Sequence, residues 1–153
     1  MRKNITLICG TLFILMAIAC SGESGEWEDS TTDKKSMILQ IGDTKLAATL
    51  ADNSSAEALA EALAKAPITI DMRDYGNMEK VGSLGRDFPT NNESITTEPG
   101  DIILYQGSAL VIYYAPNTWN FTRLGKIDDI SKEELMQVLG EGDITITLSL
   151  PEE

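Results

Sequence analysis

Trp119, Phe121 and Arg123 are the side chains of this sequence whose types and spacing best suit the binding of a ligand. They alternate within the segment NTWNFTRLGKI, so in an extended chain all three project to one face. An indole, a phenyl ring and a guanidinium on one face could hold a peptide carbonyl or an anionic ligand. The alternative is that both rings fill a core while Arg123 extends to a nearby carboxylate. We interpret the rings chiefly as the wall of the folded core, with Arg123 at the rim of a candidate binding groove.

Arg86 is the fourth candidate ligand-binding residue. It lies in GSLGRDFP, where the glycines and the proline indicate a loop. Functional loops and plain turns have this composition alike, so the sequence leaves both interpretations open. Tyr75 and Lys80 border the same loop and are weaker candidates.

The sequence offers no recognisable catalytic or metal-binding pattern. It has no histidine, which is the commonest general base and the commonest transition-metal ligand. It contains no Ser-His-Asp or Cys-His arrangement and no Gly-rich phosphate loop before a helix. Three Gly-Asp pairs match no calcium loop and indicate turns instead. We therefore predict no catalytic residue, no metal site and no cofactor.

The N-terminus has the features of an export signal. Two basic residues precede a mostly apolar run, Ile5 to Ala19, which is shorter than the ~20 residues that a transmembrane helix needs. The run ends in MAIACSGES, which resembles the lipobox of bacterial lipoproteins. The resemblance implies that Cys20 is lipidated and becomes the mature N-terminus. An ordinary secretory signal is the alternative.

These features predict the location of the protein and one class of partner that it is not expected to bind. Residues 1–19 are the expected lipoprotein signal peptide, and residues 20–36 are a lipid anchor followed by a polar, flexible tether. We expect an exported protein of the bacterial cell envelope, held at the membrane by the lipid on Cys20, because two or more acyl chains anchor stably. The 12 basic and 24 acidic residues give a net charge of −12, which disfavours nucleic-acid binding.

The remaining residues, 37–153, are long enough for one globular domain. Hydrophobic alternation and turn residues predict two hairpins, over residues 37–50 and 101–115, and strands over residues 68–72, 122–127 and 143–150. A helix is predicted from a Ser54–Glu57 capping box to Pro67, and another over residues 131–139. Residues 73–100 show little periodicity and are expected to form a long loop. We therefore predict a mainly β fold with two short helices, arranged as a small closed β-barrel.

Three blocks add a family resemblance to this interpretation. DYGNMEKVGSLGRDFP, PGDIILYQGSALVIYY and NTWNFTRLGKI, in this order, resemble the cyclophilin-like domain found in bacterial proteins. The resemblance runs from about Met37 to Leu150 and implies a closed cyclophilin-type barrel with helices over its ends. True cyclophilins carry a Phe-His-Arg type segment that this chain lacks, so the resemblance transfers no catalytic residue. We expect no appreciable prolyl isomerase activity.

The leading functional hypothesis is a lipid-anchored envelope protein whose cyclophilin-like domain binds a peptide or a small-molecule ligand without catalysis. One alternative is a diverged peptidyl-prolyl isomerase that uses Arg86 or Arg123 as its electrostatic group. A second alternative is an accessory subunit of an envelope complex, which a flexible tether would suit.

Overall fold

The computed structural model describes residues 35–152, so the expected signal peptide, the lipidation of Cys20 and most of the tether lie outside the described residues. No helix in this described part is long and apolar enough to cross a membrane. The elements follow the order β1 (Ser36–Ile41), β2 (Thr44–Leu50), α1 (Ser54–Leu63), β3 (Ile68–Tyr75), β4 (Glu79–Ser83), β5 (Glu93–Thr96), β6 (Asp101–Tyr105), β7 (Ala109–Tyr113), β8 (Thr118–Ile127), α2 (Lys132–Leu139) and β9 (Ile144–Ser149).

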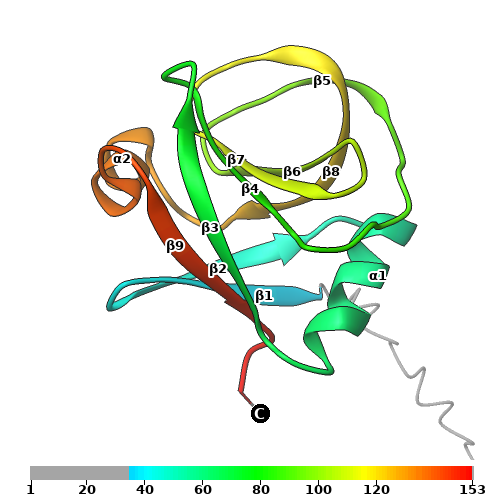
Figure 1. The fold of residues 1–153 in the computed structure, drawn as a ribbon. Coiled ribbons are helices and arrows are strands. Elements are labelled where there is room, and N and C mark those ends of the chain that lie inside the picture. The colour runs from blue at the N-terminus through cyan, green and yellow to red at the C-terminus, as the bar shows by residue number, and fades with distance from the viewer. Residues whose placement is uncertain (1–34, 153) are drawn as a thin grey trace, which may run out of the picture. The chain divides into compact units, whose positions relative to one another are not determined.

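Eight of the strands form a closed antiparallel barrel. Their order is β2-β1-β9-β3-β4-β7-β6-β8, and β8 pairs back onto β2 to close the ring. β5 pairs with the first half of β8 and lies at the top of Figure 1, at the far end of the molecule from β1. The predicted mainly β fold with a closed barrel is confirmed.

The barrel interior is filled by alternate residues of its strands. Each strand places every second side chain inward, as for Ile102 and Leu104 of β6, which are almost completely buried. The helices lie at opposite sides of the barrel in Figure 1. α1 contributes Leu59 to the same core and α2 contributes Leu135. Both helices therefore act as the covers that the sequence pattern predicted.

Both predicted hairpins are present, and residues in the left-handed region make their turns. Gly42 joins β1 to β2 with a φ of 56°, and Gln106 and Gly107 join β6 to β7 with φ values of 50° and 76°. Glycine adopts such angles without steric cost, which is why these short segments could be recognised as turns.

The prediction of a long loop over residues 73–100 is wrong. The segment contains the end of β3 and all of β4 and β5. Two buried charged residues, Glu79 and Lys80, interrupt the apolar alternation of β4, so its pattern resembles that of an exposed segment. β8 is also longer than the predicted strand over residues 122–127, because it begins at Thr118 and includes the polar residue Asn120.

The predicted cap of α1 is also wrong by one residue. The side chain of Asn53, not Ser54, accepts the Ala56 amide at 2.9 Å. Asparagine and serine cap helices equally well, so the run of four capping residues, 52–55, did not specify the start. The Ser54 hydroxyl instead accepts a hydrogen bond from Asn91 at 2.8 Å, which fixes the segment before β5 to the helix.

Candidate functional site

A second, smaller hydrophobic cluster lies on the outer face of the barrel. Because strand residues alternate, the neighbours of the inward-facing side chains on β6 and β7 must point outward. Three of these, Ile103, Val111 and Tyr113, do not reach solvent, because β5 and the first half of β8 fold over them. The cluster's buried members are Ile95, Ile103, Val111, Tyr113 and Phe121. The rings of Tyr113 and Phe121 have centroids 5.5 Å apart, which is typical of aromatic pairs in protein cores.

A bulge in β8 makes this cover possible. Ile102 pairs with Gly125, but Ile103 pairs with Arg123, so Leu124 is an extra residue that bends the strand. Gly125 lies so close to the Thr49 carbonyl that any larger residue would collide with it. The second half of β8 can therefore close the barrel, while the first half leaves it and pairs with β5.

A cleft of about 440 Å³ remains between the first half of β8 and the outer face of β3, β4 and β7. Half of its lining side chains are aromatic. The full lining is Arg73, Tyr75, Met78, Glu79, Val81, Tyr105, Tyr113, Asn117, Trp119 and Phe121. Among the described residues, four large hydrophobic side chains are exposed, and three of these line the cleft: Tyr75 and Trp119, each 65% exposed, and Tyr105.

Glu79 occupies the floor of the cleft between two tyrosines. The strand register places it directly opposite Tyr75 on one side and Tyr113 on the other. The residue is only 9% exposed. Burial raises the pKa of its carboxyl, and a hydrogen bond with Tyr113 opposes this effect in part. Burial and the neighbouring Glu79 in turn raise the pKa of the Tyr113 hydroxyl.

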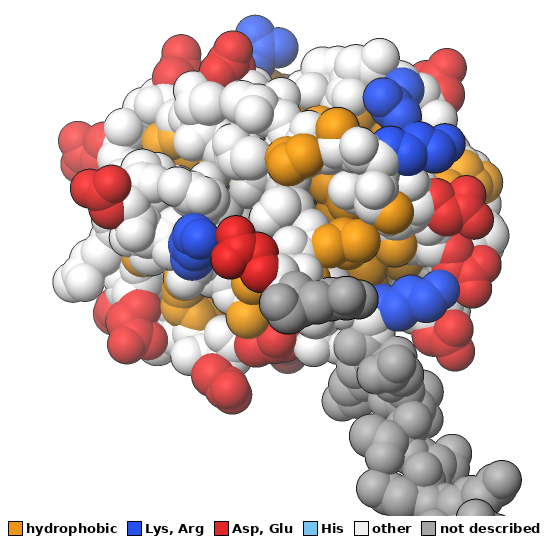
Figure 2. Space-filling model, turned by 90° about the horizontal axis from the view of Figure 1, so that it is seen from below, with side chains coloured by type: hydrophobic (Ala, Val, Ile, Leu, Met, Phe, Trp, Pro, Cys, Tyr) orange, Lys and Arg blue, Asp and Glu red, His pale blue; other side chains and the backbone are white. Residues whose placement is uncertain are grey.

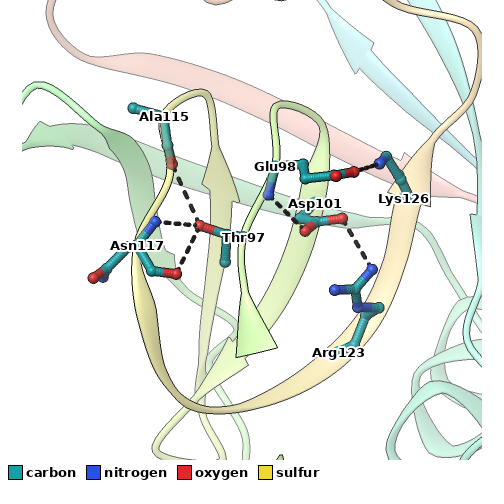
Figure 3. Close-up of polar contacts among 7 residues, drawn as sticks. All are labelled: Thr97, Glu98, Asp101, Ala115, Asn117, Arg123 and Lys126. Carbon is teal, nitrogen blue, oxygen red and sulfur yellow. Dashed lines mark hydrogen bonds and ion pairs between the residues drawn. The ribbon is translucent and has the colours of Figure 1, made fainter. Parts of the chain in front are cut away.

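Arg123 does not line the cleft, and its charge is paired with a carboxylate elsewhere. Its guanidinium donates to Asp101, which is completely buried, at 3.2 Å (Figure 3). The other carboxylate oxygen of Asp101 accepts the backbone amide of Glu98 at 2.9 Å. Glu98 in turn pairs with Lys126 at 2.5 Å, and this pair lowers the pKa of the Glu98 carboxyl. These contacts fix the turn between β5 and β6 to the middle of β8.

A second set of bonds in Figure 3 positions the entrance to β8. The buried hydroxyl of Thr97 accepts the Asn117 amide at 2.9 Å and lies within bonding distance of the Ala115 and Asn117 carbonyls. Asn117 also donates from its side chain to the Tyr113 hydroxyl at 3.3 Å. The backbone just before β8 is therefore bonded to Thr97, which follows β5, and to Tyr113 at the end of β7.

A buried charge supports β4 from the opposite side. Lys80 is almost completely buried and donates to Asp74 at 2.7 Å and to the carbonyls of Gly140 and Gly142 at 3.0 and 2.6 Å. Hydrogen bonds from Lys80 and Tyr114 lower the pKa of Asp74. Burial raises the pKa of Tyr114 to about 12. This network joins the strand under the cleft to the turn after α2.

The structure brings together two of the four residues that the sequence singled out. Trp119 and Phe121 line the cleft, whereas Arg123 is paired with Asp101 and Arg86 lies exposed in the loop after β4. The interpretation of the two rings as the wall of a core holds for Phe121, which is buried in the second hydrophobic cluster, but is wrong for Trp119, which is exposed. Ligand binding by any of the four stays a prediction.

Sequence reasoning missed most of the cleft. Arg73, Glu79, Tyr105 and Tyr113 all line it, and Tyr75 was only a weak candidate. The alternation of Arg73 with Tyr75, and of Glu79 with Val81, was a usable signal, because each pair points to one face of a strand. Within residues 35–152, no group of three or more carboxylate, cysteine or histidine side chains is placed to hold a metal ion.

The fold and site define a small closed antiparallel barrel with two helical covers and an aromatic cleft on its outer face. The family model described as the cyclophilin-like family matches residues 39–149, so this chain belongs to the cyclophilin-like family. The structure is similar to the solution structure of a hypothetical protein from Archaeoglobus fulgidus. The TM-score is 0.56 at 14% sequence identity, over 77% of this chain and 95% of the other. No curated protein matches the sequence.

Proposed function

We propose that this protein is a binding module of the cell envelope, which holds a peptide or a small-molecule ligand in the aromatic cleft. The observation that carries the proposal is the placement of Tyr75, Tyr105 and Trp119, which are exposed around one cleft that the buried ring of Phe121 also lines. Exposed aromatic side chains around a cleft are typical of ligand sites, because a bound ligand removes their apolar surface from water.

The side chains of the cleft support binding rather than catalysis. The lining contains no serine, threonine, cysteine or lysine that could act as a nucleophile. Glu79 is its single carboxylate, so the lining provides no pair of carboxylates for acid and base roles. The two arginines that the isomerase alternative would use, Arg86 and Arg123, lie outside the lining. A module that binds without reaction fits these groups best.

The cellular setting of the proposal rests on the N-terminal sequence. The short apolar run followed by Ala19 and Cys20 supports export and lipid attachment at Cys20. A polar tether after Cys20 would let the domain move near the membrane surface while it stays attached. The ligand would then be one that is available in the envelope.

A titration followed by nuclear magnetic resonance tests the binding role. The probes are the peptide acetyl-Ala-Ala-Pro-Phe-amide and, separately, 2-phenylethanol, each added to the ¹⁵N-labelled full chain. We expect shifts at the amides of β4, β7 and the first half of β8 with at least one probe. Trp119→Ala should weaken that binding by about tenfold, because a large aromatic contact is lost.

Met136→Ala provides the matched control, since Met136 is an exposed large apolar side chain outside the cleft. It should leave the binding of both probes unchanged. The absence of cleft shifts with both probes would overturn the proposal. Shifts that persist at full strength in the Trp119→Ala variant would overturn it as well.

A further inference from the structure

We propose that the cleft selects a ligand with one cationic group, an ammonium or guanidinium on an apolar body, and that Glu79 binds this group between the rings of the cleft. The inference rests on the proposed binding function and adds the chemical class of the ligand.

The first step of the argument is that Glu79 is buried without a cationic partner. Acidic side chains are rarely buried this deeply unless a positive charge compensates them. The described residues form four ion pairs within 4.0 Å, and none of them includes Glu79. Its polar neighbour is the hydroxyl of Tyr113, which cannot supply a charge. The carboxylate at the base of the cleft therefore lacks the partner that such burial normally requires.

The second step is that aromatic side chains lie around this carboxylate. Tyr75 and Tyr113 flank Glu79 in the sheet, and Phe121 and Trp119 line the same cleft from β8. Aromatic faces attract cations through their quadrupoles and repel anions. A carboxylate enclosed by rings is therefore complementary to an organic cation, because the charge meets Glu79 and the apolar part meets the rings.

The third step concerns Arg73, the one basic side chain in the lining. It lies opposite Val81, one outward-facing position away from Glu79 along the sheet, and is exposed. No ion pair that includes Arg73 occurs among the described residues. Its charge at the rim would repel a second positive group, so the cleft suits a ligand with a single cation rather than a polycation.

The net negative charge of the protein also attracts cationic ligands, but it does not explain why a cation would bind at Glu79. Acidic side chains are spread around the face of the domain shown in Figure 2, and the chain has a net charge of −12. Such a surface attracts any cation weakly and without a fixed position. The test must therefore separate binding at Glu79 from this general attraction.

Three probes with the same ring and different charges make this test. Phenethylamine is protonated at neutral pH, 2-phenylethanol is neutral and phenylacetate is an anion. Each is titrated into the ¹⁵N-labelled full chain, and affinity is read from the amide shifts of cleft residues. We expect phenethylamine to bind about tenfold more tightly than 2-phenylethanol, and phenylacetate to bind more weakly than both.

Glu79→Gln should reduce the affinity for phenethylamine to that for 2-phenylethanol and leave the alcohol's affinity unchanged. Glu61→Gln is the control, because it removes the same charge from an exposed position on α1. It should not alter the ratio between the two probes. The unchanged affinity for 2-phenylethanol also shows that the Glu79→Gln cleft is intact.

The outcomes distinguish this inference from the function on which it rests. If 2-phenylethanol binds in the cleft as tightly as phenethylamine, the binding function stands and the cation inference is overturned. The inference also fails if phenethylamine binds equally well to the Glu79→Gln variant, because the attraction is then general. If neither these three probes nor the peptide shifts the amide signals of the cleft residues, the binding function and the cation inference are both overturned.

Discussion

Asp101 shows how a single buried charge can fix a local structure. Its carboxylate is completely buried, and the guanidinium of Arg123 is the one cation that reaches it among the described residues. We predict that Arg123→Ala lowers the free energy of unfolding by about 2 kcal/mol, measured by urea denaturation. This is less than the ~3–5 kcal/mol of a fully buried pair, because the Arg123 side chain is one-third exposed and partly screened.

The control for this experiment is Arg86→Ala, an exposed loop arginine that should change stability by less than about 0.5 kcal/mol. Adding Asp101→Asn to Arg123→Ala should recover part of the loss, since the buried charge is then removed. Equal stabilities of the Arg86 and Arg123 variants would show that Asp101 does not need this partner.

Glu79 should make stability depend on pH in the opposite sense from an ordinary paired carboxylate. Its folded-state pKa is raised, so between the unfolded value of about 4.3 and that raised value the folded state binds more protons. The Glu79 contribution to stability therefore falls as the pH rises through this window. We predict that Glu79→Gln gains stability relative to the native chain as the pH rises above about 4.

Thermal unfolding across this pH range, in the absence of ligand, checks the prediction. The titratable and charged side chains that line the cleft with Glu79 are Arg73, Tyr75, Tyr105 and Tyr113. Glu61→Gln should show no such pH-dependent difference. A constant difference between the Glu79→Gln and native curves would contradict the raised pKa.

At the level of single residues, the sequence could reveal the rings of the cleft but not its charge. Aromatic residues make up 6% of the chain, so the alternation of Trp119 and Phe121 was conspicuous. Glu79 lay in a segment that resembled a loop, and nothing in the local pattern marked it as buried. Its partners across the sheet come from β3 and β7, and that neighbourhood depends on strand order.

At the level of elements, the close approach of β4 to β3 depends on Gly82. A methyl group at this position would lie 2.5 Å from both the Asp71 carbonyl oxygen and the Cγ2 atom of Ile70. We predict that Gly82→Ala lowers the free energy of unfolding by about 1–3 kcal/mol, the usual cost of overpacking a core. Urea denaturation measures this loss.

Ser83→Ala is the matched control, because Ser83 is the exposed neighbour of Gly82 on the same strand. It should change stability by less than about 0.5 kcal/mol. If Gly82→Ala is as stable as the native chain, the two strands have room to separate, and the position of Glu79 over β3 is less fixed than the contacts indicate.

The elements themselves divide into those that local chemistry specifies and those that it does not. The hairpin turns, the capping box of α2 between Ser131 and Glu134, and the glycine that ends that helix could be predicted from neighbouring residues alone. β4 and β5 could not, because their stability comes from partners elsewhere in the sheet. Pairing between distant strands leaves no short-range signal when charged residues such as Lys80 are buried.

At the level of the whole molecule, the proposed lipid anchor on Cys20 would hold the barrel at the membrane. We predict that Cys20→Ala abolishes incorporation of an alkyne-labelled palmitate in bacterial cells and shifts the protein from the detergent phase to the aqueous phase. The physical reason is that each buried CH₂ of an acyl chain contributes ~0.8 kcal/mol to membrane binding.

Cys9→Ala tests the same chemistry at the other cysteine of the chain, and it should leave both labelling and partition unchanged. A native protein that takes up no label and is found in the aqueous phase would refute the anchor. Binding in the cleft would remain testable in that case, since it depends on residues of the barrel alone.

The closure of the barrel between β2 and β8 also sets the order in which this chain can fold. The first hairpin has no permanent neighbours until the last third of the chain is available, because β1 needs β9 and β2 needs β8. A ribosome or a translocation pore releases the N-terminal end first, so this hairpin emerges with both outer edges unpaired. Long-range pairing of this kind slows folding and leaves edges exposed to other chains meanwhile. We therefore expect the first hairpin to be most prone to aggregation in the interval before β8 and β9 are released.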